Sequence, residues 1–212
     1  MNGIVAPHLD DYLLAHAPRR DRVLRDMEAL AEREGIPIVG PAVGALLELL
    51  ARSHGARRVF ELGSAIGYST IWWARAVGPR GRVYYTDADP HNAERATRFL
   101  RRARVADRVE VLVGDALESL RRTRGTFDVI FNDVDKWEYP SVLRQAVPRL
   151  KRGGLLVTDN ALWYGKVATE ADDADTRGVR LYNRRAARSR QLLTTILPLR
   201  DGVSVAMRVD DA

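Results

Sequence analysis

Two places in the chain put hard oxygen groups directly after an apolar segment. Asp133 follows one such segment, with Lys136 three residues later, and the pair Asp159-Asn160 follows another. If both segments are neighbouring strands of a parallel sheet, their carboxyl ends meet at one edge, which is where ligands bind in such sheets. Three oxygen groups without a thiolate or clustered histidines favour Mg²⁺ or a similar octahedral cation over zinc. Capping of the strand ends is the competing interpretation, and the neighbouring lysine makes it the weaker one.

A turn that contains two glycines is a second candidate site. It spans residues 61–69, and Gly63 and Gly67 allow a sharp turn and a close approach of the backbone to a ligand. The helix expected after it would offer free N–H groups to an anion. An ordinary tight turn is an equal alternative for this pattern alone. The Gly-x-Gly-x-x-Gly pattern of dehydrogenases is absent, which makes a dehydrogenase a poor candidate.

Two more positions fall where further strands should end. Asp87 is placed to accept hydrogen bonds from a ribose diol. A helix N-cap is the alternative role, but Asp89 before a proline is the better cap, which would leave Asp87 free for a ligand. Residues 114–116 are small and polar and would line an adenine slot, unless Asp115 serves only to cap the next helix.

The elements that must position these residues alternate between strand and helix patterns. We expect strands at 57–62, 82–86, 108–113, 127–132 and 154–158, and helices at 67–77, 92–104, 116–122 and 138–150. Residues 191–197 and 203–209 are expected to form an antiparallel hairpin around the turn Asp201-Gly202. This order predicts an α/β fold with a seven-stranded, mostly parallel sheet, its last strand antiparallel and helices on both faces.

The first fifty residues follow a helical pattern. Residues 9–34 are interrupted at Pro18, so two helices are expected there, and a third is expected at 42–53. We expect one domain over residues 1–212, in which an N-terminal helical cap (1–53) precedes an α/β cofactor-binding core (54–212).

Composition and charge limit the possible classes of protein. The 212 residues are 46% hydrophobic and include no cysteine, which excludes disulfides, thiolate metal ligands and a cysteine nucleophile. No apolar run is long enough to cross a membrane and no secretory signal opens the chain, so a cytoplasmic location is expected. The net charge of +6 comes almost entirely from arginine, in clusters that fit solvated helix faces better than a dedicated RNA surface.

Four segments together resemble the cation-dependent O-methyltransferases, a family that includes catechol and caffeoyl-CoA O-methyltransferases and many bacterial relatives. They are residues 61–69, 113–116, 131–136 and 157–163, and the resemblance extends over about residues 36–208. It implies the Rossmann-like fold of class I methyltransferases, S-adenosylmethionine as cofactor, a divalent cation such as Mg²⁺, and a homodimer.

The resemblance also implies roles for single residues. Lys136 and Asp133 would be catalytic. The metal would be held by Asp133, Asp159 and Asn160, and S-adenosylmethionine by Val39, Glu61, Gly63, Ser69, Asp87, Ala116 and Asp133.

The chain departs from the family pattern at a few positions. Ala65 stands where many other methyltransferases have glycine, and Asn132 replaces the usual apolar residue before the metal-binding aspartate. Residues 166–175, rich in alanine and aspartate, would form a substrate lid whose sequence does not identify the substrate.

These features predict a metal-assisted methyl transfer to one hydroxyl of a small molecule with two adjacent oxygens, in which Lys136 accepts or directs the proton. Trp137, Trp163 and Tyr164 would supply apolar walls, or would instead pack in the core or at a dimer contact. One alternative substrate is 5-hydroxyuridine in tRNA, which also presents adjacent oxygens. A non-catalytic nucleotide- or RNA-binding module is the alternative from another class.

Overall fold

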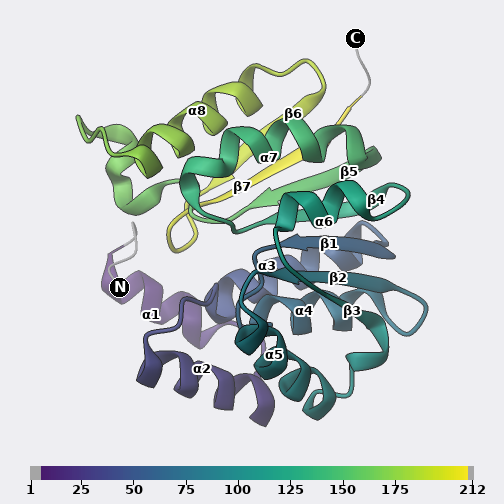
Figure 1. Ribbon diagram of the computed structural model, residues 1–212. Coiled ribbons are helices and arrows are strands. Elements are labelled where there is room, and N and C mark those ends of the chain that lie inside the picture. The colour runs from purple at the N-terminus through teal and green to yellow at the C-terminus, as the bar shows by residue number, and fades with distance from the viewer. Residues whose placement is uncertain (1–5, 210–212) are drawn as a thin grey trace.

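The computed structural model describes residues 6–209, whose strands form one sheet of seven in the order β3-β2-β1-β4-β5-β7-β6 (Figure 1). Strands β1 to β5 pair in parallel, and β7 runs antiparallel to both of its neighbours, β5 and β6. The predicted fold class and the hairpin are therefore confirmed. The strands are β1 Arg58–Leu62, β2 Arg82–Asp87, β3 Val109–Val113, β4 Phe127–Asn132, β5 Leu150–Thr158, β6 Leu192–Leu197 and β7 Val203–Arg208.

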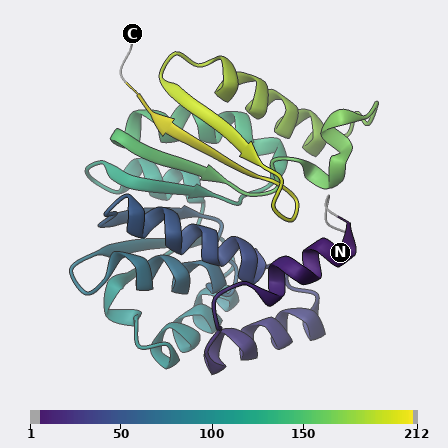
Figure 2. The same ribbon diagram turned by 180° about the vertical axis from the view of Figure 1, so that it is seen from behind.

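Helices cover both faces of this sheet, because successive strand residues point to opposite sides. Val59 and Val129 lie in a core shared with α2 to α5, whereas the adjacent Phe60 and Ile130 lie in a core shared with α6 to α8. Figure 1 shows α6, α7 and α8 over one face, and Figure 2 shows the other face from behind. The helices are α1 Pro7–Ala15, α2 Arg22–Glu34, α3 Gly40–Ser53, α4 Tyr68–Val77, α5 Pro90–Arg102, α6 Ala116–Arg122, α7 Tyr139–Ala146 and α8 Ala174–Arg188.

The structure differs from the sequence expectation between β4 and β6. The helix predicted at 138–150 ends at Ala146, since Pro148 lacks an N–H and leaves only a short 3₁₀ turn before β5. No bounds were predicted for helix α8, although the arginine cluster at 184–190 indicated a helix face there, and the start of α8 falls within the expected 166–175 loop. The Asp173 side chain caps this helix by accepting a hydrogen bond from the backbone N–H of Thr176 at 2.9 Å. Asp173 lies in a run of alanine and aspartate that has no apolar periodicity. The sequence therefore does not show whether this aspartate caps a helix or belongs to a loop.

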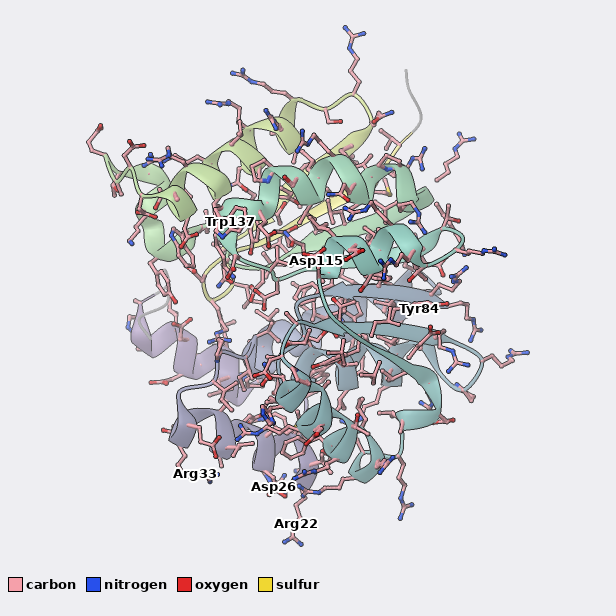
Figure 3. The ribbon with its side chains drawn as sticks, in the orientation of Figure 1. Arg22, Asp26, Arg33, Tyr84, Asp115 and Trp137 are labelled. Carbon is pink, nitrogen blue, oxygen red and sulfur yellow. The ribbon has the colours of Figure 1, made fainter. Side chains whose placement is uncertain are left out.

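The N-terminal helices are joined to the rest of the chain in two ways. Helix α2 carries acidic side chains that pair with arginines of α5, as in Glu34 with Arg95 at 2.8 Å and Asp26 with Arg102 (Figure 3 labels Asp26). Helix α3 instead packs into the main core through buried apolar residues. Part of the arginine excess is thus used in ion pairs within the chain. The predicted division into a helical cap (1–53) and a cofactor-binding core (54–212) stays a prediction.

Within residues 6–209, none of the helices combines the length and apolar character that a bilayer crossing needs.

The contact between α3 and α4 depends on Gly44. A Cβ at this position would lie 2.3 Å from Nε1 of Trp72, a side chain that is only 2% exposed and lies in the main core. We expect Gly44→Ala to lower the free energy of unfolding by about 1–3 kcal/mol through overpacking. Urea unfolding followed by circular dichroism measures this change.

Leu49→Ala, at a position of the same helix that is 63% exposed, is the control and should change the free energy of unfolding by less than about 0.5 kcal/mol. If Gly44→Ala were as stable as the wild type or more stable, the close approach of the two helices would be wrong.

Candidate active site

A cavity of about 930 Å³ lies at the carboxyl ends of the parallel strands. Residues 36–42, the turn between β6 and β7, and parts of α1 and α2 complete its wall. Most of the residues predicted for the site line it, namely Val39, Gly63, Ser69, Asp87, Ala116, Asp133, Lys136, Asp159 and Asn160. The structure thus brings both halves of the predicted site into one space. Glu61 is the exception, since it does not line the cavity.

The turn after β1 joins these two halves. Gly63 has φ +78°, and a Cβ there would lie 2.6 Å from the backbone oxygen of Asp133, so only glycine allows β1 and β4 to end this close together. Ala65 also adopts a left-handed conformation, with φ +43°. Two hydrogen bonds hold it: its N–H donates to Asp87 Oδ2 at 2.8 Å, and its carbonyl accepts from the Tyr85 hydroxyl at 2.6 Å.

Asp87 lies in the cavity wall, but its carboxylate is not free. It accepts hydrogen bonds from the backbone of Ala65 at 2.8 Å, the backbone of Asp89 at 2.9 Å and the amide of Asn92 at 3.2 Å. The expected cap is confirmed, since Asp89 accepts from the backbone of His91, and Asp87 does not cap α5, but three local donors already use its carboxylate. A carboxylate has about four acceptor positions, so about one remains for a ligand.

Asp115 combines the two roles that the sequence left open. Its side chain caps α6 by accepting from the backbone N–H of Glu118 at 2.6 Å, and it also lines the cavity (Figure 3 labels it at the start of α6).

Glu61 lies behind the cavity wall and is fully buried. The Thr70 hydroxyl donates to its Oε2 at 2.5 Å, whereas its Oε1 has no hydrogen-bond partner among the described residues. Burial raises the pKa of Glu61 to about 7, and the charge of Asp133 adds to this effect, while the hydroxyls of Ser69 and Thr70 oppose it. Glu61 therefore supports the wall from behind.

Backbone hydrogen bonds that continue the sheet place two carboxylates side by side. The N–H of Asp133 donates to the carbonyl of Leu62 at 2.9 Å, and that of Asp159 donates to the carbonyl of Asn132 at 3.1 Å. Asn132 is fully buried, so the unusual polar residue does not break the strand end.

Electrostatics at these carboxylates fit a cation. Burial and the charge of Asp133 raise the pKa of Asp159 to about 7, and burial raises the pKa of Asp133 although Lys136 opposes it. Oδ1 of Asp159 is buried and has no hydrogen-bond partner in the described chain. Over residues 6–209, no three His, Cys, Asp or Glu side chains lie close enough to hold a metal, so a third ligand must come from another residue type. The amide of Asn160 fits, and the all-oxygen set matches Mg²⁺.

Lys136 adjoins these carboxylates. Its Nζ donates to Asp133 Oδ1 at 3.1 Å and to the carbonyl of Val134 at 3.3 Å. It also lies 5.7 Å from the centroid of the Trp163 ring. Trp163 and Tyr164 line the cavity, as one interpretation predicted, whereas Trp137 is 58% exposed and does not.

Two residues of the β6–β7 turn were missed as site residues. Arg200 and Asp201 line the cavity, and the sequence identified only a turn there. The signal was available in the predicted topology, because β7 pairs antiparallel with β5 and the turn before it must return to the edge where β5 ends.

The sheet order and a cavity at the strand ends define a class I methyltransferase. A family model described as O-methyltransferase matches residues 21–209. A catechol O-methyltransferase of Mycobacterium tuberculosis is 39% identical over 177 residues, 82% of this chain and 80% of that protein. A catechol O-methyltransferase of Niastella koreensis is 33% identical, over 98% of this chain and 99% of that protein.

Among solved structures, an O-methyltransferase from Bacillus cereus in complex with SAH has a TM-score of 0.86 at 30% identity, covering 95% of this chain and 97% of that one. The chain belongs to the O-methyltransferase family, in its cation-dependent group, and is a methyltransferase that uses S-adenosylmethionine. Of the functions considered from the sequence, the non-catalytic module is therefore excluded.

The buried carboxyl of Glu61 predicts a pH effect on stability. Its folded pKa of about 7 lies above the ordinary 4.5, so the folded state binds the proton more tightly than the unfolded chain does. The free energy of unfolding should therefore fall as pH rises from about 4.5 to 7. Glu61→Gln removes this dependence, and relative to the variant the wild type should lose about 3 kcal/mol over that window.

Urea unfolding of both proteins at several pH values between 4.5 and 8 checks this prediction. Glu110→Gln, at an exposed position of β3, is the control and should follow the wild type. If the free energy of unfolding changed with pH in the same way in Glu61→Gln and the wild type, the raised pKa of Glu61 would be contradicted.

Proposed function

We propose that this enzyme methylates one hydroxyl of a small molecule with two adjacent oxygens, with the help of a divalent cation held by Asp133, Asp159 and Asn160. The observation that carries the proposal is a pair of carboxylates at neighbouring strand ends: Asp133, which Lys136 contacts, and the buried Asp159, which has an unpaired oxygen. The names of the two catechol O-methyltransferase relatives support the same substrate class.

The chain's own residues would act in defined places. A divalent cation supplies positive charge that makes an adjacent hydroxyl more acidic. Lys136 Nζ, held by Asp133 and the Val134 carbonyl, would take the hydroxyl proton or stabilise the negative charge that develops. The rings of Trp163 and Tyr164 would flank the substrate and limit the access of water.

The cofactor side of the cavity would be formed by Val39, Gly63, Ser69, Asp87 and Ala116. S-adenosylmethionine supplies the methyl group from a sulfonium centre, which carries a positive charge. In the cavity wall carboxylates outnumber basic side chains by ten to three, although the whole chain is positive. This local negative charge favours both a sulfonium group and a divalent cation.

The charge distribution gives the tRNA substrate less support than the small molecule. Phosphates that approach the cavity would meet mostly carboxylates. A more open groove of about 1040 Å³, lined by six arginines, lies between β3 and the end of α6, and none of the predicted site residues lines it. A homodimer and a cytoplasmic location stay predictions from the sequence.

Removing a proposed metal ligand tests the metal-assisted reaction. With a catechol as substrate, Asp159→Ala should lower kcat by more than about 10³-fold, because several kcal/mol of charge stabilisation is lost. Calorimetry should give a nearly unchanged affinity for S-adenosylmethionine, and Asp107→Ala at an exposed site should keep full activity. Wild-type turnover that persists in a chelator would rule out a cation. Activity on tRNA and none on small catechols would contradict the small-molecule substrate and favour tRNA.

Lys136 can be tested separately from the cation. Lys136→Met should lower kcat about 10²–10⁴-fold, as expected for loss of a positioned proton acceptor. The dependence of the remaining rate on Mg²⁺ concentration should stay. Lys166→Met is the matched control, because Lys166 also lies near the Trp163 ring but does not line the cavity. An equal loss of kcat in the two variants would contradict a role of Lys136 in the reaction.

A further inference from the structure

The turn between β6 and β7 is tied to the turn that follows β5. The N–H of Leu162 donates to the carbonyl of Asp201 at 2.9 Å, and that of Ala161 donates to the carbonyl of Gly202 at 2.8 Å. Gly202 has φ +85°, and a Cβ there would lie 2.5 Å from Leu162 Cγ. The two turns are therefore packed against each other without spare room.

The side chain of Asp201 lies within this contact and is only 9% exposed. Its Oδ1 accepts a hydrogen bond from the backbone N–H of Tyr164, and its Oδ2 accepts from Asn160 Nδ2 at 3.3 Å. Both partners are donors that point at the same carboxylate. A group that only accepts hydrogen bonds is required to satisfy both of them.

This contact decides which end of the Asn160 amide faces Asp201. The NH₂ group can donate to a carboxylate, whereas the amide oxygen would be repelled by it. With Nδ2 held by Asp201, the amide oxygen Oδ1 is the atom left to bind a cation. Asn160 is directly adjacent to Asp159 and lines the same cavity.

The backbone of the same segment adds a second requirement. Asn160, Trp163 and Tyr164 have φ of +52°, +44° and +54°, a region that residues other than glycine occupy at a cost of about 1–3 kcal/mol each. Such a conformation persists only where the surroundings hold it. Asp201 holds this segment at both ends, through the Asn160 side chain and the Tyr164 N–H.

We propose that Asp201 is a positioning residue that orients Asn160, so that its Oδ1 serves as the third metal ligand. This inference rests on the proposed function, since it assumes that the centre binds a cation. Asp201 is not proposed as a ligand itself: in the described chain no three acidic side chains lie close enough to share a metal, and both oxygens of Asp201 already have partners.

The test measures binding of Mn²⁺ to the full-length protein by electron paramagnetic resonance, with no substrate present. Asp201→Asn keeps the shape of the side chain but replaces one acceptor with a donor, which then faces the NH₂ group of Asn160. We expect Mn²⁺ to bind about 10–100-fold more weakly, as is typical when a residue that orients a metal ligand is changed.

An exchanged pair provides the rescue. In Asn160→Asp combined with Asp201→Asn, the new amide at position 201 can donate to the carboxylate at position 160 and still accept from the Tyr164 N–H. The double variant should therefore recover Mn²⁺ affinity relative to Asp201→Asn alone. Because a carboxylate at position 160 also strengthens cation binding by its charge, Asn160→Asp alone is measured as well. If Asp201 only fills space, Asp201→Asn should weaken Mn²⁺ binding by the same factor with Asn or Asp at position 160, whereas orientation of residue 160 predicts a smaller loss with Asp.

Asp173→Asn is the matched control, since Asp173 makes the same kind of local hydrogen bond at the start of α8 and does not line the cavity. It should bind Mn²⁺ like the wild type, and all variants should keep their affinity for S-adenosylmethionine if they are folded. Unchanged Mn²⁺ binding in Asp201→Asn, or no recovery in the exchanged pair, would overturn the role of Asp201 and leave the metal-assisted function standing. A wild type that binds no Mn²⁺ would overturn both.

Discussion

The repulsion between Asp133 and Asp159 is the constraint on which the rest of the site depends. Their positions follow from the parallel pairing of β4 with β5, so the fold brings a buried carboxylate, Asp159, next to a partly buried one, Asp133. Burying like charges is unfavourable unless a positive group compensates them. The protein provides Lys136 in direct contact with Asp133, and the charge of Arg200 also acts on both carboxylates. An unpaired buried oxygen on Asp159 remains, and this oxygen supports the proposed cation.

Close packing of backbone at glycines connects this centre to the cofactor side. Gly63 lets the end of β1 contact the backbone of Asp133, and Gly202 lets the β6–β7 turn contact the segment after β5. Both glycines have positive φ, so neither position tolerates another residue without strain. The cavity is therefore assembled from the ends of five parallel strands and the β6–β7 turn, and backbone contacts at the two glycines fix the spacing between β1 and β4 and between that turn and the segment after β5.

Much of the fold and of the site follows from the sequence. Alternating strands and helices predict a parallel sheet, and in such a sheet ligands bind at the edge formed by the carboxyl ends of the strands. The residues directly after each of the strands β1 to β5 were found in this way. Glu61 was placed in the cofactor set by resemblance, but the period of two in a strand does not distinguish a residue in the cavity wall from one behind it. Asp87 was expected to be free, and three local donors that use it are visible only in three dimensions. The arginines near the end of α8 indicated a helix face, but its start was missed because a run of alanine and aspartate gives no periodic pattern.

Asp201 illustrates why such omissions concentrate at one kind of position. The pair Asp201-Gly202 is a strong turn signal. That signal alone accounts for an aspartate at this position, so the sequence does not indicate a second role for its side chain. In this fold the antiparallel β7 returns the turn to the carboxyl edge of β5, where a buried carboxylate meets two donors of a strained segment. The parallel strands supply site residues at their carboxyl ends, whereas the antiparallel β7 begins at this edge, so the turn that precedes it lies beside the site. Residues before an antiparallel strand should therefore be considered together with those after the parallel ones when a site is derived from sequence.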